Sequence, residues 1–133
     1  MHPKLEEATA LLRKRLPNVL AVYQFGSFGT PFEKTSSDVD LAFLNPVNLS
    51  SVELWNLEQE LSVLLQKDVD LIDLRSQPTV MRMQVISTGD RIWCGDFNAS
   101  EVFEDFVFSD YANLSERRQD IINDVRKRGS VYG

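Results

Sequence analysis

The sequence predicts a single α/β domain with a small sheet flanked by helices, because amphipathic segments of helical period alternate with short apolar runs of strand type. The 133 residues are close to the usual size of one domain. A chain of this size buries roughly two thirds of its unfolded surface, which is enough for a core without disulfides. The single Cys and single His, Cys94 and His2, exclude a structural zinc site and a Cys–His catalytic pair. We therefore expect one domain over residues 1–133.

The first half of the chain predicts a helix followed by two strands. Leucine and alanine at helical spacing indicate a helix over 3–15 that ends near Pro17. The run VLAVYQF over 19–25 is β-branched and aromatic and stops at Gly26, as expected for a buried strand that enters a glycine turn. A second strand is expected over 38–44, where turn residues follow.

The middle of the chain predicts a helix, a strand, a helix and a strand. Ser50 and Glu53 form a capping box for a helix that ends near Gln66. The apolar face of this helix is expected to comprise Val52, Trp55, Leu57, Leu61, Leu64 and Leu65. A third strand over 69–74, a helix over 78–87 and a fourth strand over 91–94 follow.

The last part of the chain predicts a C-terminal helical segment over about 100–128, with an interruption near Asn113. Phe103, Phe106 and Phe108 cannot all point the same way on one helix, so at least one of them is expected to be exposed at an interface. Residues 115–133 carry a net charge of +2, which leaves −8 for the remaining residues. This basic end favours the helix dipole and also offers a surface to a partner.

The overall charge of −6 argues against direct nucleic-acid binding, because that binding draws its affinity from Lys and Arg that replace counterions. No apolar run approaches the roughly 20 residues of a membrane span. The N-terminus enters an acidic, amphipathic stretch instead of the apolar core of a signal peptide. We therefore expect a cytoplasmic protein with no membrane partner.

A glycine turn and a pair of acids suggest the chemistry. Gly26-Ser27 ends the first strand, ten residues follow, and Asp38-Val39-Asp40 opens the second strand. Residues i and i+2 of a strand share a face, so Asp38 and Asp40 project together and repel each other unless a cation lies between them. Hard oxygen ligands favour Mg²⁺ or Mn²⁺. The glycine turn adds backbone N–H groups and a hydroxyl that can bind a phosphate.

A third carboxylate from the strand at 69–74 would complete a two-metal site for an in-line displacement. Asp70 is the preferred candidate because it lies inside the strand, and Asp68 at its entry is the second choice, whereas Asp73 falls on the opposite face. An EF-hand fails here because Ile72 stands where an oxygen ligand is needed. A phosphate grip, a metal pair and a general base together predict nucleotidyl or phosphoryl transfer.

These motifs resemble a known family. Gly26-Ser27, the ten-residue spacing, Asp38-x-Asp40 and the acidic strand around Asp70 are similar to the minimal nucleotidyltransferase domain of the polymerase β superfamily. The tail from Phe106 to Tyr132 is similar to the C-terminal helix of the antitoxins in that family that are encoded beside HEPN-domain toxins. The resemblance implies a polymerase-β-like fold with a small mixed sheet flanked by helices.

The resemblance also implies roles for individual residues. Asp38 and Asp40 would bind two Mg²⁺ ions, or Mn²⁺, and the triphosphate of ATP, and Asp70 would be the third ligand and accept a proton from the acceptor hydroxyl. Ser27 with the Gly26 turn would hold a phosphate. Apart from the resemblance, Ser37 beside Asp38 is expected to cap a turn, and contact with a phosphate is the alternative that makes it a nucleotide-binding candidate. Many relatives have glycine at the position of Pro31, and the nearest glycine here is Gly29, so the details of the phosphate loop differ.

For the antitoxins, the resemblance implies transfer of AMP to a tyrosine of the HEPN toxin, which blocks the toxin's RNase activity and requires a hetero-oligomer of the two proteins. Two alternatives remain open. An aminoglycoside-type nucleotidyltransferase usually carries an additional helical domain, for which 133 residues leave little room. A non-catalytic nucleotide-binding module would instead neutralise a toxin by stoichiometric binding.

Overall fold

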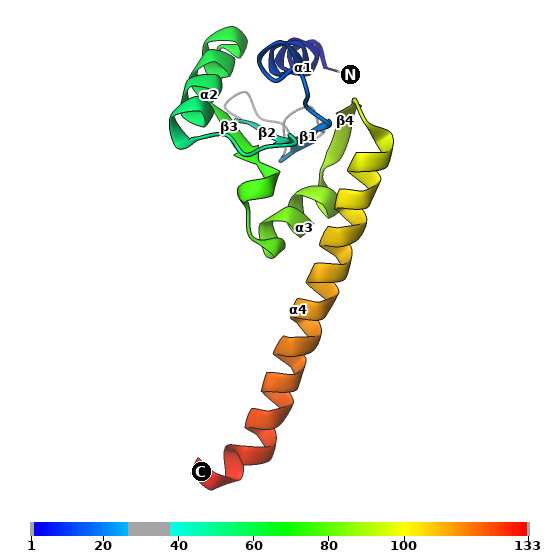
Figure 1. Ribbon diagram of the computed structural model, residues 1–133. Helices are drawn as coiled ribbons and strands as arrows, with labels where there is room; N and C mark the ends of the chain where they lie inside the picture. Colours follow the sequence, from blue (N-terminus) through cyan, green and yellow to red (C-terminus); the bar gives the residue numbers. More distant parts are fainter. Residues whose placement is uncertain (1, 27–37, 133) are drawn as a thin grey trace.

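The protein folds into a four-stranded mixed sheet with two helices on each face (Figure 1). The computed structural model describes residues 2–26 and 38–132. The elements are α1 (Pro3–Arg15), β1 (Ala21–Phe25), β2 (Val39–Leu44), α2 (Ser51–Leu65), β3 (Val69–Asp73), the 3₁₀ helix η1 (Leu74–Ser76), α3 (Thr79–Thr88), β4 (Asp90–Cys94) and α4 (Phe97–Tyr132). The expected α/β class and the small mixed sheet are confirmed. No helix in the described part of the chain is both long and apolar enough to span a membrane.

The strand order β3-β2-β1-β4 sets the position of every candidate side chain. β1 is antiparallel to both β2 and β4, whereas β2 and β3 are parallel. The C-terminal end of β1 therefore lies beside the N-terminal ends of β2 and β3. That edge of the sheet is where the sequence places Gly26 and the acidic residues.

Each face of the sheet has its own apolar core. α1 and α2 cover the face that carries Val39, Leu41 and Phe43, all of which are fully buried. The opposite face carries Ala42 and Leu44 and is covered by α3 and the first turns of α4. The strict alternation along β2 explains how two acids at its start can share one face while their neighbours enter the core.

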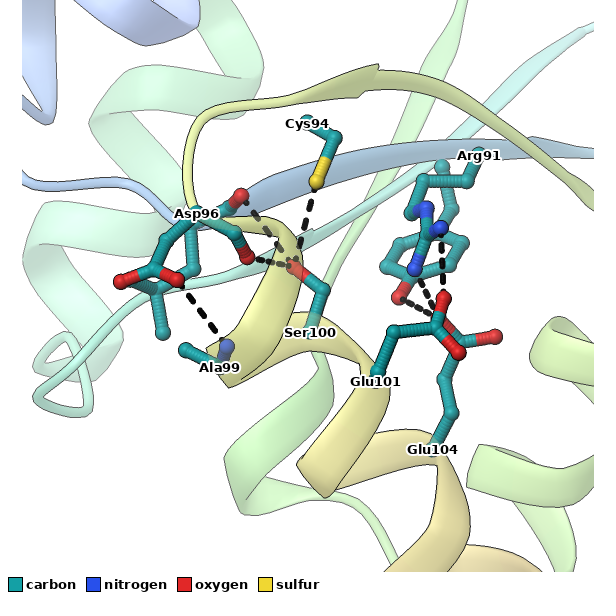
Figure 2. Close-up of polar contacts among 9 residues, drawn as sticks. Arg91, Cys94, Asp96, Ala99, Ser100, Glu101 and Glu104 are labelled. Carbon is teal, nitrogen blue, oxygen red and sulfur yellow. Dashed lines mark hydrogen bonds and ion pairs between the residues drawn. The ribbon is translucent and has the colours of Figure 1, made fainter.

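Two expectations for the helices are wrong. α2 buries only Leu57, Leu61 and Leu65, a stripe of period four. Val52, Trp55 and Leu64 of the expected apolar face lie off this stripe and are 69%, 61% and 43% exposed. A second error concerns the C-terminal segment, because α4 is continuous through Asn113 and begins at Phe97. The earlier start follows from Asp96, whose Oδ1 accepts a hydrogen bond from the backbone N–H of Ala99 at 3.0 Å and so caps the helix (Figure 2).

A buried polar network fixes α4 to the sheet (Figure 2). Tyr23 on β1 donates a hydrogen bond to Glu104 on α4 at 3.1 Å. Arg91 on β4 pairs with both Glu104, at 2.5 Å, and Glu101, at 2.8 Å. Burial and the charge of Glu104 raise the pKa of Tyr23, so its hydroxyl stays protonated and remains a donor. The start of α4 is therefore rigidly attached, whereas its second half extends away from the rest of the molecule (Figure 1).

Candidate active site

Three carboxylates lie at the edge of the sheet where β2 and β3 begin. Asp38 is exposed just before β2, Asp40 is half-buried as its second residue, and Asp70 is exposed as the second residue of β3. Asp40 and Asp70 are direct partners in the parallel register of the two strands. Since neighbouring strands are about 4.8 Å apart, this register brings the two side chains together on one face. On the other side of Asp40, its antiparallel partner is Phe25, the last residue of β1.

Gly26 crosses directly over the carboxylate of Asp40. Its φ is +76°, a left-handed conformation that glycine adopts without steric cost. A Cβ atom at this position would lie only 2.2 Å from Oδ2 of Asp40. The chain therefore needs glycine here for two reasons, the backbone turn and the close approach to a carboxylate. Sequence reasoning assigned this glycine only to a phosphate and missed its contact with Asp40.

The electrostatics of the site depend on Asp40. Burial raises the pKa of this carboxyl, and the negative charges of Asp70 and Asp38 raise it further. Each of these effects penalises the ionised form, and each is relieved by a cation placed among the three oxygens. The site is therefore arranged to attract positive charge.

The two other acids of the β3 segment have different surroundings. Asp73 is 1% exposed, its Oδ2 accepts a hydrogen bond from the backbone N–H of Leu49, and its Oδ1 accepts one from the backbone N–H of Arg75. This carboxylate holds two loops together on the face away from Asp40. Asp68 is exposed and its backbone carbonyl accepts a hydrogen bond from Val39, so its contribution in the structure is to the start of the sheet.

The donor set suits a hard divalent cation that is shared with a phosphate. Among the described residues, no three Asp, Glu, His or Cys side chains meet closely enough to hold a metal ion by themselves. Mg²⁺ is commonly bound through one or two carboxylates together with substrate phosphates and water, and does not require an all-protein cage. Asp38, Asp40 and Asp70 supply oxygen ligands of that kind. Ser27, Ser37, Gly29 and Pro31 lie outside the described residues.

Comparison with known families agrees with this arrangement. The family described as polymerase beta, nucleotidyltransferase matches residues 6–98, a span that contains the whole sheet and all three carboxylates. The chain belongs to this nucleotidyltransferase family.

Several relatives of this nucleotidyltransferase have been studied. It is 39% identical over 115 residues to the protein adenylyltransferase MntA of Shewanella oneidensis, with 86% of this chain and 82% of that protein aligned. A toxin–antitoxin complex with AMP-PNP contains a chain that is 37% identical, with a TM-score of 0.80 over 91% of this chain and 97% of that one. The MNT antitoxin in complex with the tri-AMPylated HEPN toxin of Shewanella oneidensis is 36% identical, with a TM-score of 0.77 over 92% of this chain and 96% of that one.

A second glycine supports the site of this nucleotidyltransferase and was not singled out by sequence reasoning. Gly89 lies between α3 and β4, and a Cβ there would lie 2.7 Å from the carbonyl oxygen of Gln24 and 3.2 Å from Cβ of Phe25. The end of α3 therefore packs against the last residues of β1, directly before Gly26. In the sequence, Gly89 is recognisable only as a glycine at the end of a predicted helix. Glycine is common at that position, so the pattern does not reveal which other segment the backbone of Gly89 contacts.

Proposed function

We propose that this nucleotidyltransferase transfers AMP from ATP to a tyrosine hydroxyl of a HEPN-domain RNase toxin and acts as its antitoxin. The observation that carries the proposal is the register of β2 and β3, which pairs Asp40 with Asp70 beneath Gly26. The similarity to a protein adenylyltransferase, at 39% identity, supports AMP as the transferred group. The similarity to antitoxins in toxin complexes, one of them with a tri-AMPylated HEPN toxin, supports the toxin as acceptor.

The proposed reaction is an in-line displacement at the α-phosphorus of ATP. The tyrosine oxygen forms a bond to this phosphorus, the bond from the phosphorus to the bridging oxygen breaks, and pyrophosphate leaves. Asp70 accepts the phenolic proton, because its exposed side chain beside Asp40 is accessible to an acceptor from outside. A protein acceptor can approach from outside, because Asp38 and Asp70 are exposed at this edge of the sheet.

The three carboxylates are proposed as the ligands of two Mg²⁺ ions, with Mn²⁺ as a substitute. Asp40 is placed centrally, since both other acids act on its pKa. Bound metal would supply the positive charge that offsets the triphosphate and polarises the reacting phosphorus. Gly26 fixes the position of Asp40 through its close backbone approach. Ser27 and Ser37 are proposed to contact the nucleotide, and we propose a cytoplasmic location for the protein.

Intact-mass spectrometry of the toxin tests the proposal. The chain is incubated with ATP, Mg²⁺ and a HEPN-domain toxin, and we expect the toxin to gain the mass of one or more AMP units. Asp70→Asn should slow the transfer by about 10²–10⁴-fold, the usual contribution of a general base. Asp38→Asn and Asp40→Asn each remove a proposed metal ligand and should slow it at least as much. Asp68→Asn is the matched control, because Asp68 is an exposed acid just before the same strand, and this variant should retain most of the rate.

Two results would contradict the proposal. Undiminished AMP transfer by the Asp38 and Asp40 variants would refute the assigned mechanism. If those variants transfer no AMP but still block the toxin's RNase activity at equal stoichiometry, the protein is a binding module for which catalysis is dispensable.

A further inference from the structure

A cavity of about 630 Å³ opens at the end of the sheet opposite the carboxylates. Its walls include Pro46 after β2, Arg75 of η1, Arg82 of α3, and Val102, Phe103 and Phe106 of α4. β2 runs from Asp40 at the site to Leu44 near this cavity, a separation of about 13 Å along the strand. We call it the arginine pocket. It is distinct from the candidate active site.

Two positive charges in the arginine pocket have no acidic partner among the side chains that the structure describes. The guanidinium groups of Arg75 and Arg82 lie 5.6 and 5.5 Å from the centre of the Phe103 ring. Their guanidinium groups donate to backbone carbonyls: Arg75 donates to Asn45, and Arg82 donates to Leu74 at 2.9 Å and to Arg75 at 2.5 Å.

Within residues 2–26 and 38–123, neither group forms an ion pair, although the chain has six more acids than bases. A guanidinium has five N–H donors, so both side chains retain donors for an external anion. The charge of the pocket is therefore complementary to a carboxylate supplied from outside.

The rim of the arginine pocket is apolar and exposed. Val102 and Phe106 are one helical turn apart on α4 and are 68% and 59% exposed. Phe103, between them in sequence, is buried beneath the arginines. Arginine and aromatic residues around a partly desolvated centre are the composition enriched in the hot spots of protein interfaces.

We propose that the arginine pocket docks a partner protein, through a segment that places an acidic side chain against Arg75 and Arg82 and an apolar side chain against Val102 and Phe106. The inference rests on the proposed function, which supplies the partner: the HEPN toxin. A different chain is preferred to a second copy because the related solved structures are complexes of a toxin with an antitoxin. Docking here would hold the toxin along α4 and leave the carboxylate edge of the sheet accessible to its tyrosine.

The proposal is tested by isothermal titration calorimetry of the chain with the HEPN protein in the absence of nucleotide. The measurement compares the affinities of two variants that carry opposite charges at the rim of the arginine pocket. Val102→Glu and Val102→Lys disturb the apolar rim similarly but differ in charge. We expect Val102→Glu to weaken binding by about tenfold or more, a typical hot-spot effect, and Val102→Lys to weaken it by no more than about threefold. The matched control is Val63→Glu on α2, which places the same charge on a 79% exposed residue over the other face of the sheet. This variant should bind the HEPN protein as tightly as the original chain does.

The outcomes separate the alternatives. Equal weakening by Val102→Glu and Val102→Lys would overturn the acidic partner segment, and no weakening by either would overturn docking at this surface. Sedimentation in the absence of toxin covers the other occupant, because self-association that Val102→Glu abolishes would assign the surface to a second copy. AMP transfer is scored separately with the unaltered chain. If that chain transfers no AMP while binding still depends on the charge at position 102, the proposed function fails and the docking surface stands.

Discussion

Replacement of Gly26 by alanine should disable the site while leaving the fold largely intact. The added Cβ would lie 2.2 Å from Oδ2 of Asp40, whereas real Cβ contacts are essentially never shorter than 3.0 Å. The backbone and the carboxylate must therefore separate by at least about 0.8 Å. A misplacement of about 1 Å at a reacting centre can cost on the order of 10²-fold in rate. The left-handed φ adds about 1–2 kcal/mol of strain for a residue with a Cβ, which for a domain of this size lowers Tm by about 3–8 °C.

The assay compares initial rates of AMP transfer to the toxin at a temperature well below the Tm of each variant. Gly95→Ala is the matched control, because its Cβ would lie 2.4 Å from the indole of Trp93 at the opposite end of the sheet. We expect that variant to lose stability but to keep its rate per folded molecule. A Gly26→Ala protein whose rate stays within about threefold of the original would refute the argument that the close backbone approach positions Asp40.

Three further predictions follow from the charges and hydrogen bonds of the described residues. The pKa of Asp40 is raised in the folded state, so the ionised carboxylate opposes folding. Asp40→Asn should therefore raise Tm at pH 7. This gain should vanish below about pH 3, where the carboxyl is protonated in both the folded and the unfolded state. Thermal unfolding between pH 3 and 8 checks this, and a gain that does not vary with pH would contradict it. Removal of divalent cations with EDTA should stop AMP transfer and leave the Tm of the nucleotide-free chain unchanged, with activity restored by Mg²⁺ or Mn²⁺; transfer that persists in EDTA would exclude a metal role. In the network between α4 and the sheet, Tyr23→Phe should lower the free energy of unfolding in urea by about 1 kcal/mol. Arg91→Met should lower it by about 1–3 kcal/mol, because this change leaves Glu104 without its charged partner. An equal loss of stability in both variants would argue that Arg91 is not essential to the network.

Much of the site could be predicted because it depends on local periodicity. Alternation in a strand was sufficient to expect Asp38 and Asp40 on one face, and the structure places Asp70 beside Asp40 in the sheet. The preference for Asp70 over Asp68 as a metal ligand stays a prediction. Periodicity does not contain the register between strands, which is set by the packing of whole elements. The pairing of Asp40 with Asp70 and the passage of Gly26 over Asp40 therefore emerged only from the structure.

The errors have physical causes as well. Trp55 is two, six and ten residues from the buried Leu57, Leu61 and Leu65, so it lies on a different side of α2. Contacts with α1 and the sheet decide which side of this helix is buried. Arg82 donates to the carbonyls of η1 and lies over Phe103, and nothing in the sequence around it indicates these partners. Both outcomes depend on contacts between segments that are distant along the chain. A single sequence without such contacts cannot distinguish them.

The second half of α4 has a consequence for how long the free protein survives. At 1.5 Å per residue the 36 residues of this helix span about 54 Å, but between residues 115 and 123 every side chain is exposed. A helical segment without tertiary contacts is marginally stable in water, so its local unfolding requires far less free energy than unfolding of the sheet. Proteases that act on locally opened backbone would therefore cleave this segment first, without waiting for the domain to unfold. A partner seated along α4 would suppress that opening, and the cellular lifetime of the chain would then report whether it is bound.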